Sequence, residues 1–290
     1  MSHLFCFGLG YSAGVIAKRL AAREWSVTGT STTEQGCAAI QAHGWGAAQF
    51  DGHAAAPAIP AALAPATHIL LSIPPGADGD PVFHHHGQDI ATGRSIAWIG
   101  YFSTVGVYGD ANGGWVDENT EARPASERGN RRLLAEEQWR KLGREAGMCT
   151  NIFRLPGIYG PGRSAIDDVR AGTARRIIKP GQVFNRIHVE DIASAVIAAI
   201  GRPLSDRVYN VTDDEPGPPQ DVVAYAADLL GLPCPPALDF ATAELSPMTR
   251  SFYGESKRVA NARMKADLGV QLAYPTYREG LTELAKSPGH

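Results

Sequence analysis

The chain has 290 residues, enough for one large domain or two small ones with a substantial core. Its 27 Lys and Arg residues nearly balance its 30 Asp and Glu residues, so charge gives no driving force for binding nucleic acid or an anionic membrane. The four cysteines lie far apart without a C-x-x-C pair, and we find neither a signal peptide nor an apolar run long enough to span a bilayer. We therefore expect a soluble, cytoplasmic protein with reduced cysteines.

Residues 4–33 have the pattern of a strand, a glycine turn, a helix and a second strand, which opens a dinucleotide-binding βαβ unit. Gly8 and Gly10 have the G-x-G spacing, and Ala13 occupies the third position of G-x-G-x-x-G/A. Gly8 permits a tight turn, and Gly10 lets the backbone approach a pyrophosphate at the N-terminus of the helix. The alternative is a glycine turn in an α/β protein that binds no nucleotide.

Strands and helices alternate along most of the chain. Strands are expected at 25–28, 47–50, 67–72, 95–102, 150–155, 184–188 and 207–211, and helices at 33–43, 81–92, 125–146, 164–172, 190–200, 218–230, 256–268 and 276–286, with helix and loop between 54 and 65. In the long helix at 125–146, the apolar residues Leu133, Leu134, Trp139 and Leu142 are expected on the inner side. This alternation predicts an α/β fold with a doubly wound parallel sheet.

The end of the second strand carries hydroxyl groups at Thr30, Ser31 and Thr32, and the first carboxylate is Glu34. NAD-preferring proteins usually place an acid there to bind the ribose 2′-hydroxyl, whereas hydroxyl groups can bind a 2′-phosphate without repelling it. The sequence therefore favours NADP over NAD, although the arginine often found at this place in NADP-binding proteins is missing.

Other groups of polar residues are expected to be structural. His84, His85 and His86 point in different directions on a helix, so they are expected to be surface histidines and not a metal site. His188 and Asp191 fit a strand end and a helix start, where Asp191 would cap backbone N–H groups. Thr104 and the serine before it lack a G-x-S-x-G elbow, which argues against a hydrolase.

Four motifs, in this order, resemble the extended short-chain dehydrogenase/reductases, the NAD(P)-dependent epimerase/dehydratase group. They are F-S-T-V-G-V-Y-G-D (102–110), R-L-P-G-I-Y-G-P-G (154–162), R-I-H-V-E-D-I-A (186–193) and Y-N-V-T-D-D-E-P (209–216). The short G-L-G-Y opening, the S-I-P-P segment at 72–75 and the segment 257–269 resemble the atypical, YeeZ-like branch.

The resemblance implies an NAD(P)-binding Rossmann core at 1–162 and 184–212 and a smaller substrate lobe at 163–183 and 213–290, interleaved as one compact unit. It implies that the cofactor contacts the phosphate turn with Gly8, Gly10, Tyr11 and Ala13, the hydroxyls of Thr30, Ser31 and Thr32, the acid Asp51, and the loops with Ser72, Ile73, Pro74, Leu155 and Pro156. Thr104 matches the catalytic Ser/Thr position of the family. A homodimer through the helix at 125–146 is also expected from the resemblance.

The chain departs from the family at the catalytic pair. Family enzymes use Tyr-x-x-x-Lys, in which the lysine lowers the pKa of the tyrosine, but here the aligned positions hold Arg128 and Arg132. Arginine stays protonated, so Arg128 is a poor proton donor, whereas Arg132 can still hold a ribose or phosphate. Tyr108 or Tyr159 could supply the proton instead, and the alternative for both is a packed loop anchor.

A second departure concerns the substrate. Sugar-nucleotide members often carry an arginine four residues before the histidine of H-V-x-D, and this chain has Phe184 there, with Arg186 close by. We therefore expect an NADP- or NAD-dependent oxidoreductase or epimerase/dehydratase-like protein acting on a small polar substrate, with Thr104, Arg128 and Arg132 as candidate catalytic residues. The alternative is a non-catalytic NAD(P)-binding sensor or partner-binding module.

Overall fold

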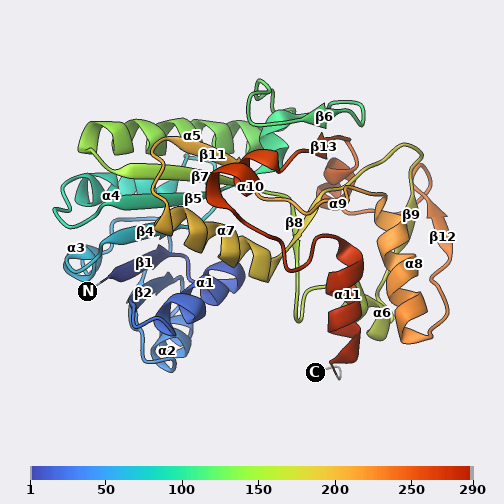
Figure 1. Ribbon diagram of the computed structural model, residues 1–290, viewed down its shortest axis with the longest axis horizontal. Coiled ribbons are helices and arrows are strands. Elements are labelled where there is room, and N and C mark those ends of the chain that lie inside the picture. The colour runs from blue at the N-terminus through green and yellow to red at the C-terminus, as the bar shows by residue number, and fades with distance from the viewer. Residues whose placement is uncertain (1, 288–290) are drawn as a thin grey trace. The chain divides into compact units, whose positions relative to one another are not determined.

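The computed structural model describes residues 2–287, and the chain divides into two compact units, each described by itself below. Unit 1 is formed by Met1–Val107, Ser126–Arg154 and Ala193–Tyr209, and unit 2 by Tyr108–Ala125, Leu155–Ile192 and Asn210–His290. Figure 1 shows both units and labels most of their elements.

Unit 1 is built on a seven-stranded sheet with the order β11-β7-β5-β4-β1-β2-β3. Its strands are β1 (His3–Phe7), β2 (Ser26–Ser31), β3 (Gly46–Gln49), β4 (His68–Leu71), β5 (Trp98–Thr104), β7 (Cys149–Leu155) and β11 (Arg207–Asn210). Pairing is parallel, with Leu4 of β1 opposite Val27 of β2 and His68 of β4. The predicted α/β fold with a parallel sheet is confirmed. Because the chain leaves β1 on one side towards β2 and returns on the other as β4, the topological switch point lies between the carboxyl ends of β1 and β4.

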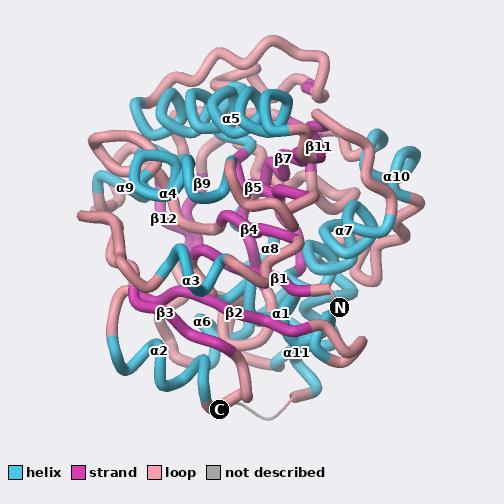
Figure 2. The backbone as a smooth tube through the Cα atoms, turned by 90° about the vertical axis from the view of Figure 1, so that its left-hand side faces the viewer, coloured by secondary structure: helices cyan, strands magenta, loops and turns pink. Residues whose placement is uncertain are grey.

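Helices pack on the sheet of unit 1, as Figure 2 shows from the side. They are α1 (Tyr11–Ala21), α2 (Glu34–Gln41), α3 (Ile59–Leu63), α4 (Pro81–Ala91), α5 (Glu127–Ala146) and most of α7 (Val189–Gly201). The helices α1 and α7 are joined where Arg19 Nη1 donates to Ser194 Oγ at 2.9 Å. On α4 and α5, the rings of Phe83 and Trp139 meet edge to face with centroids 5.2 Å apart. Trp139 is fully buried and belongs to the main core of this unit.

The inner side of α5 differs from the prediction. Its buried residues are Gly129, Arg132, Ala135, Glu136, Trp139 and Gly143. Leu134 is 51% exposed, so its predicted inward position is wrong, while Leu133 and Leu142 are half-buried. Helical geometry explains the error, because a residue two positions before Glu136 points to the opposite side of the helix.

One of the three consecutive histidines on α4, His86, is buried, so the prediction that all three are surface residues is wrong for it. The Nδ1 of His86 is 2.9 Å from Asp89 Oδ2, and its Nε2 accepts the N–H of Ala56 at 3.2 Å. His84 is exposed and His85 is half-buried. Within residues 2–287, no three His, Cys, Asp or Glu side chains are arranged to hold a metal ion.

Unit 2 consists of short elements around small cores. They are β6 (Trp115–Val116), β8 (Gly157–Tyr159), α6 (Ala165–Arg170), β9 (Arg176–Ile178), β10 (Arg186–His188), α8 (Pro219–Leu230), β12 (Ala237–Asp239), α9 (Pro247–Phe252), β13 (Arg258–Val259), α10 (Ala262–Leu268) and α11 (Tyr277–Lys286). Parallel pairs join β8 with β10, β9 with β12, and β6 with β13. The helices α6, α8 and α11 share one core that includes Tyr159, Tyr277 and Leu281.

Two sequence expectations change in unit 2. The helix expected at 256–268 begins only at Ala262, because Arg258 and Val259 pair with β6 as a strand. The carboxylate of Asp191 accepts the N–H groups of Ala273 at 2.7 Å and Tyr274 at 3.0 Å, and thus fixes the C-terminal segment that precedes α11.

The described helices include none that combines the length and the apolar character needed to cross a membrane. All four cysteines are free: Cys6 is buried, Cys37 and Cys149 are half-buried, and Cys234 is exposed.

Candidate functional site

The glycine turn at the end of β1 is held in a conformation that requires glycine. Gly8 has φ of +82°, and a Cβ atom there would lie 2.9 Å from Cγ1 of Ile73. The N–H of Gly8 donates to Oγ1 of Thr30 at 2.8 Å, and the N–H of Leu9 donates to the carbonyl of the same threonine at 3.0 Å. The turn is therefore fixed against the ends of β2 and β4, at the switch point of the sheet.

The N-terminus of α1, directly after this turn, lacks a cap. Gly10 occupies the N-cap position without a side-chain hydrogen bond, and among the described residues the first turn contains no acidic side chain. Cβ atoms added at Gly10 or Gly14 would meet nothing within 4 Å, so the backbone is open on this side. Because first-turn N–H groups have no intrahelical acceptors and the helix dipole is positive here, the geometry fits a pyrophosphate. Ala13 is fully buried, where a small side chain keeps α1 close to the sheet.

The hydroxyl groups at the end of β2 divide into two kinds. Thr30 is 1% exposed and its hydroxyl accepts the Gly8 N–H, so it shapes the turn from inside. Ser31 is half-buried and Thr32 exposed. Gln49 Nε2 donates to the carbonyl of Thr32 at 3.0 Å, so these hydroxyls lie beside the end of β3. Ser31 and Thr32 thus remain as the hydroxyls that could meet a ribose or its phosphate.

Two further segments predicted to contact the cofactor lie at the same edge of the sheet. Asp51 is exposed after β3, and its Oδ1 accepts the N–H of His53 at 2.9 Å. The N–H of Ser72 donates to the carbonyl of Phe7 at 2.9 Å, which continues the pairing of β1 and β4. Beyond Ser72, Ile73 is half-buried against Gly8, and Pro74 is exposed.

The predicted catalytic residues of unit 1 have different surroundings. Thr104, at the carboxyl end of β5, is half-buried and its Oγ1 accepts the N–H of Gly106 at 3.1 Å, inside the 3₁₀ turn η1 (Val105–Tyr108). Arg132 is only 9% exposed; its guanidinium donates to the carbonyl of Phe102 and lies 5.9 Å from the ring centroid of Tyr101. Arg128 lies one turn earlier on α5 and is exposed. Much of the Arg132 side chain is thus used between α5 and β5.

A buried ion pair that the sequence analysis missed stands next to Arg132. Glu136 is 1% exposed and accepts both Nε and Nη2 of Arg154, at 3.0 and 2.7 Å. The hydroxyl of Ser103 donates to the same carboxylate at 2.5 Å. These bonds join the middle of α5 to the carboxyl ends of β5 and β7. The local sequence around Glu136, R-L-L-A-E at 132–136, does not indicate its distant partner Arg154.

The remaining predicted site residues belong to unit 2. Leu155 is buried at the end of β7, and Pro156 is half-buried before β8. The two alternative proton donors are engaged: Tyr108 Oη donates to Asn210 Oδ1 at 2.8 Å, and Tyr159 Oη donates to the carbonyl of Thr276 at 3.3 Å. Burial also raises the pKa of Tyr159 above its ordinary value. Both tyrosines therefore have the contacts of loop anchors.

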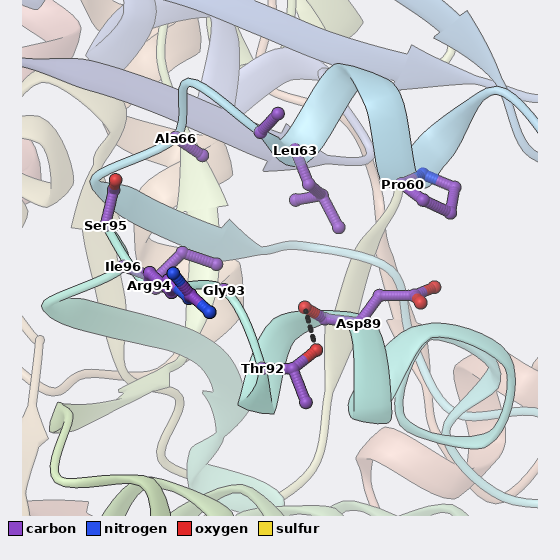
Figure 3. A pocket seen from close by; sticks show the side chains of 10 residues that line it. Pro60, Leu63, Ala66, Asp89, Thr92, Gly93, Arg94, Ser95 and Ile96 are labelled. Carbon is purple, nitrogen blue, oxygen red and sulfur yellow. Dashed lines mark hydrogen bonds between the residues drawn. The ribbon is translucent and has the colours of Figure 1, made fainter.

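A cavity of about 260 Å³ in unit 1 lies away from the glycine turn. Figure 3 shows its lining, which includes Leu63 of α3, Ile96 before β5 and the hydrogen bond from Thr92 to the carbonyl of Asp89. The residues before β4 and β5 mark the amino ends of the strands, whereas the glycine turn lies at the carboxyl ends. This cavity is therefore separate from the candidate cofactor site.

Known proteins resemble this chain over nearly its whole length. The profile described as "NAD dependent epimerase/dehydratase family" matches residues 93–212. Protein YeeZ of Escherichia coli (strain K12) is 28% identical over 95% of this chain and 97% of its own. The structure of a functionally unknown conserved protein from Silicibacter pomeroyi DSS is 48% identical, covers 98% of both chains and has a TM-score of 0.88.

A more distant structure shares the fold. The UDP-glucuronic acid 4-epimerase from Bacillus cereus in complex with NAD is 16% identical, with 98% of both chains covered and a TM-score of 0.75. The family profile, the YeeZ homology and the Rossmann-type sheet agree with the resemblance found in the sequence motifs. Residues 93–212 therefore match the NAD dependent epimerase/dehydratase family, and the chain as a whole is similar to protein YeeZ and to the Silicibacter pomeroyi protein, in agreement with the atypical extended short-chain dehydrogenase/reductase that its motifs resemble.

Proposed function

We propose that this protein binds NADP at the turn of Gly8 to Ala13 and acts as an oxidoreductase or epimerase/dehydratase-like enzyme on a small polar substrate. The observation that carries the proposal is the combination of a glycine-only turn at the switch point with an uncapped, open helix N-terminus. Tyr11 would flank the pyrophosphate, and the loop of Ser72, Ile73 and Pro74 would pass beneath the cofactor.

NADP is preferred in this proposal because of the end of β2. Ser31 and Thr32 offer hydroxyl groups without a neighbouring carboxylate before Glu34, and Asp51, which is exposed after β3, would hydrogen-bond the adenine amino group. Thr30 supports the turn and would act on the cofactor only through Gly8.

When bound, the nicotinamide supplies hydride transfer. Thr104 would hydrogen-bond the substrate oxygen, and the loop of Leu155 and Pro156 would border the nicotinamide. Arg132 would contribute positive charge near the ribose through donors that it does not use on the carbonyl of Phe102. Arg128, exposed and permanently charged, is suited to an anionic group of the ligand and not to proton donation.

A second candidate function is a non-catalytic NAD(P)-binding sensor or partner-binding module. The observation in its favour is the burial of Arg132 between α5 and β5, together with the hydrogen bonds that engage Tyr108 and Tyr159. Cofactor binding would then persist without a proton donor.

Titration of NADPH and NADH by fluorescence tests the binding site, using Gly10→Glu and Gly201→Glu. Both glycines have open space for a Cβ, so both variants are expected to fold, but only the first places a carboxylate where the pyrophosphate would bind. We expect NADPH affinity to fall by more than about tenfold in Gly10→Glu and to be unchanged in Gly201→Glu. Equal affinities in the two variants would contradict the site, and no binding of either nucleotide would contradict both candidate functions.

A substrate screen that follows nicotinamide oxidation separates the two functions, with Thr104→Ala as the matched variant. Loss of turnover with retained NADPH binding supports the role of Thr104. Turnover that is unaffected by the substitution removes Thr104 from the mechanism.

We further propose a cytoplasmic homodimer. The four free cysteines suit a reducing compartment, and the exposed Leu134 gives α5 an apolar side chain for a partner helix. Sedimentation of Leu134→Glu tests the interface, and an unchanged oligomeric state would exclude this face.

A further inference from the structure

Unit 2 contains a cavity of about 450 Å³ between β8, β10, α8 and α11. Its wall is largely apolar and includes Ile158, Phe184, Val222, Tyr277 and Leu281. A cavity of about 150 Å³ lined by apolar side chains is known to accept benzene, so this one has room for one or two rings with substituents.

The aromatic part of the wall is held rigid by neighbouring rings. The centroids of Phe184 and Tyr253 lie 5.1 Å apart, and Tyr253 in turn stacks on Phe240 at 5.0 Å. On the other side, Tyr277 is 3% exposed and meets the ring of Tyr225 edge to face at 5.8 Å. Rings fixed in this way offer a preorganised surface for a planar ligand.

Arg186 supplies positive charge within this wall. Its guanidinium donates to the carbonyls of Phe184 at 3.3 Å and Gly217 at 3.2 Å, and its Cζ lies 5.4 Å from the centroid of Tyr277. These bonds fix the group while leaving further N–H donors, because a guanidinium carries five. It is therefore placed to receive one anionic group.

The other polar side chains of the lining are engaged or lie at the rim. The Asn185 side chain donates to the carbonyl of Lys257 at 3.0 Å and accepts the N–H of Val259 at 2.9 Å. The hydroxyl of Ser164 donates to Asp167 at 2.6 Å. Arg163 and Asp168, which are both exposed, bring opposite charges to the rim.

Asp213 is the carboxyl group that interacts most strongly with the charge of Arg186. It is 2% exposed, and its Oδ2 has no hydrogen-bond partner within the described residues. Burial raises its pKa to about 8, while Arg186 acts in the opposite direction and Asp214 and Glu215 act in the same direction. The raised pKa favours the neutral form of this carboxyl group. The positive charge of Arg186 then remains available to a ligand.

We propose that this cavity binds an aromatic carboxylic acid, with its ring against Phe184 and Val222 and its carboxylate at Arg186. Arg186 is the half-buried guanidinium of the wall and matches one negative charge, while Arg163 is exposed at the rim, where Asp168 brings the opposite charge; the apolar wall matches a ring without phosphate groups. The identification of this ligand as the substrate rests on the proposed function. Its binding to the cavity does not, because binding needs no cofactor.

Binding is tested by saturation-transfer NMR and calorimetry on the full chain without nucleotide. The probes are benzoate, 4-hydroxycinnamate and 2-naphthoate, with cyclohexanecarboxylate, 4-hydroxycinnamyl alcohol and UDP-glucose for comparison. We expect at least one aromatic acid to bind about tenfold more tightly than each comparison compound. Absence of binding by all three acids at millimolar concentration, or tighter binding of UDP-glucose, would overturn the proposal.

Location is tested with Val222→Trp, which fills the cavity, against Leu232→Trp, an exposed aliphatic residue of the same unit. Val222→Trp should lower the affinity for the aromatic acid by about tenfold or more, and Leu232→Trp should leave it unchanged. Arg186→Lys is an independent test, because it should lower the affinity for the acid while leaving the affinity for the neutral alcohol unchanged. Equal binding by Val222→Trp and Leu232→Trp would place the ligand elsewhere.

NADPH titration of the same preparations keeps the two proposals apart. Acid binding without NADPH binding leaves the cavity site in place and removes the proposed function. NADPH binding without acid binding overturns the cavity site and leaves the proposed function in place.

Discussion

Replacing Asp213 by Asn tests the charge state of the buried carboxyl group in unit 2. Between pH 3.8 and about 8 the folded chain keeps a proton on Asp213 that the unfolded chain gives up, so unfolding releases a proton and stability falls as pH rises. Asn cannot ionise, and its oxygen can still accept the N–H of Glu215, which Asp213 Oδ1 accepts at 3.3 Å. The variant should therefore lose less stability than the wild type at high pH.

The magnitude follows from the raised pKa. Each pH unit in this range is worth about 1.4 kcal/mol for one group, so the wild type would lose up to about 4 kcal/mol more than Asp213→Asn between pH 5 and 8. Solvation of the ionised carboxylate by local rearrangement would reduce this value, and we expect a difference of about 1–4 kcal/mol. The lowered pKa of His188 changes stability in the opposite sense, but equally in both proteins.

Urea unfolding followed by circular dichroism from pH 5 to 8 provides the measurement, with Asp214→Asn as the matched control. Asp214 is exposed and paired with Lys265, so its replacement should shift the curve by less than about 1 kcal/mol without a pH trend. Parallel pH profiles of wild type and Asp213→Asn would refute the reasoning. A constant loss of about 3–5 kcal/mol in Asp213→Asn would also refute it, because it would show an ionised Asp213 paired with Arg186.

Three further predictions concern unit 1. Glu136→Gln should destabilise the fold by about 3–5 kcal/mol in chemical denaturation, because it removes the buried carboxylate charge that pairs with the guanidinium of Arg154. Thr30→Val removes the acceptor of the Gly8 N–H and should cost about 1–3 kcal/mol, with weaker NADPH binding in the fluorescence titration. Gly8→Ala should cost at least about 1–2 kcal/mol in thermal or urea unfolding, because it adds left-handed backbone strain to a close contact with Ile73.

Each of these substitutions has a nearby control. Glu137→Gln and Thr32→Val change exposed side chains of the same types, and Gly14→Ala adds a methyl group where nothing lies within 4 Å. The controls should change unfolding free energy by less than about 0.5 kcal/mol. Losses as large as those of the paired variants would mean that burial and contacts do not explain the effects.

The parts of the fold predicted well from sequence are those fixed by local patterns. The apolar run ending at Phe7 and the spacing of Gly8 and Gly10 predict a strand and a turn without reference to the rest of the chain. The strands of two or three residues in unit 2, such as β6 and β13, carry too little periodicity to be predicted. Pairing with a distant strand defines them.

The candidate site was predictable as a set of positions but less so as a set of roles. Thr30 was expected to face a cofactor phosphate, and the structure uses its hydroxyl on an N–H group 22 residues away in sequence. Likewise, the burial of His86 depends on its bond to Ala56, which no helical pattern contains. Long-range hydrogen bonds decide such roles, and single-sequence patterns do not report them.

The polar inner side of α5 bears most directly on whether the protein is an enzyme. Arg132 occupies the position aligned with the family lysine, but its guanidinium donates to the carbonyl of Phe102, and the next inward turn carries the ion pair of Glu136 and Arg154. These groups hold the carboxyl ends of β5 and β7 against α5. In the proposed function, the same residues would preserve the scaffold of the cofactor site without supplying a proton donor. Binding and chemistry become separable properties in this chain, and a variant series that measures NADPH affinity and turnover in parallel will distinguish them.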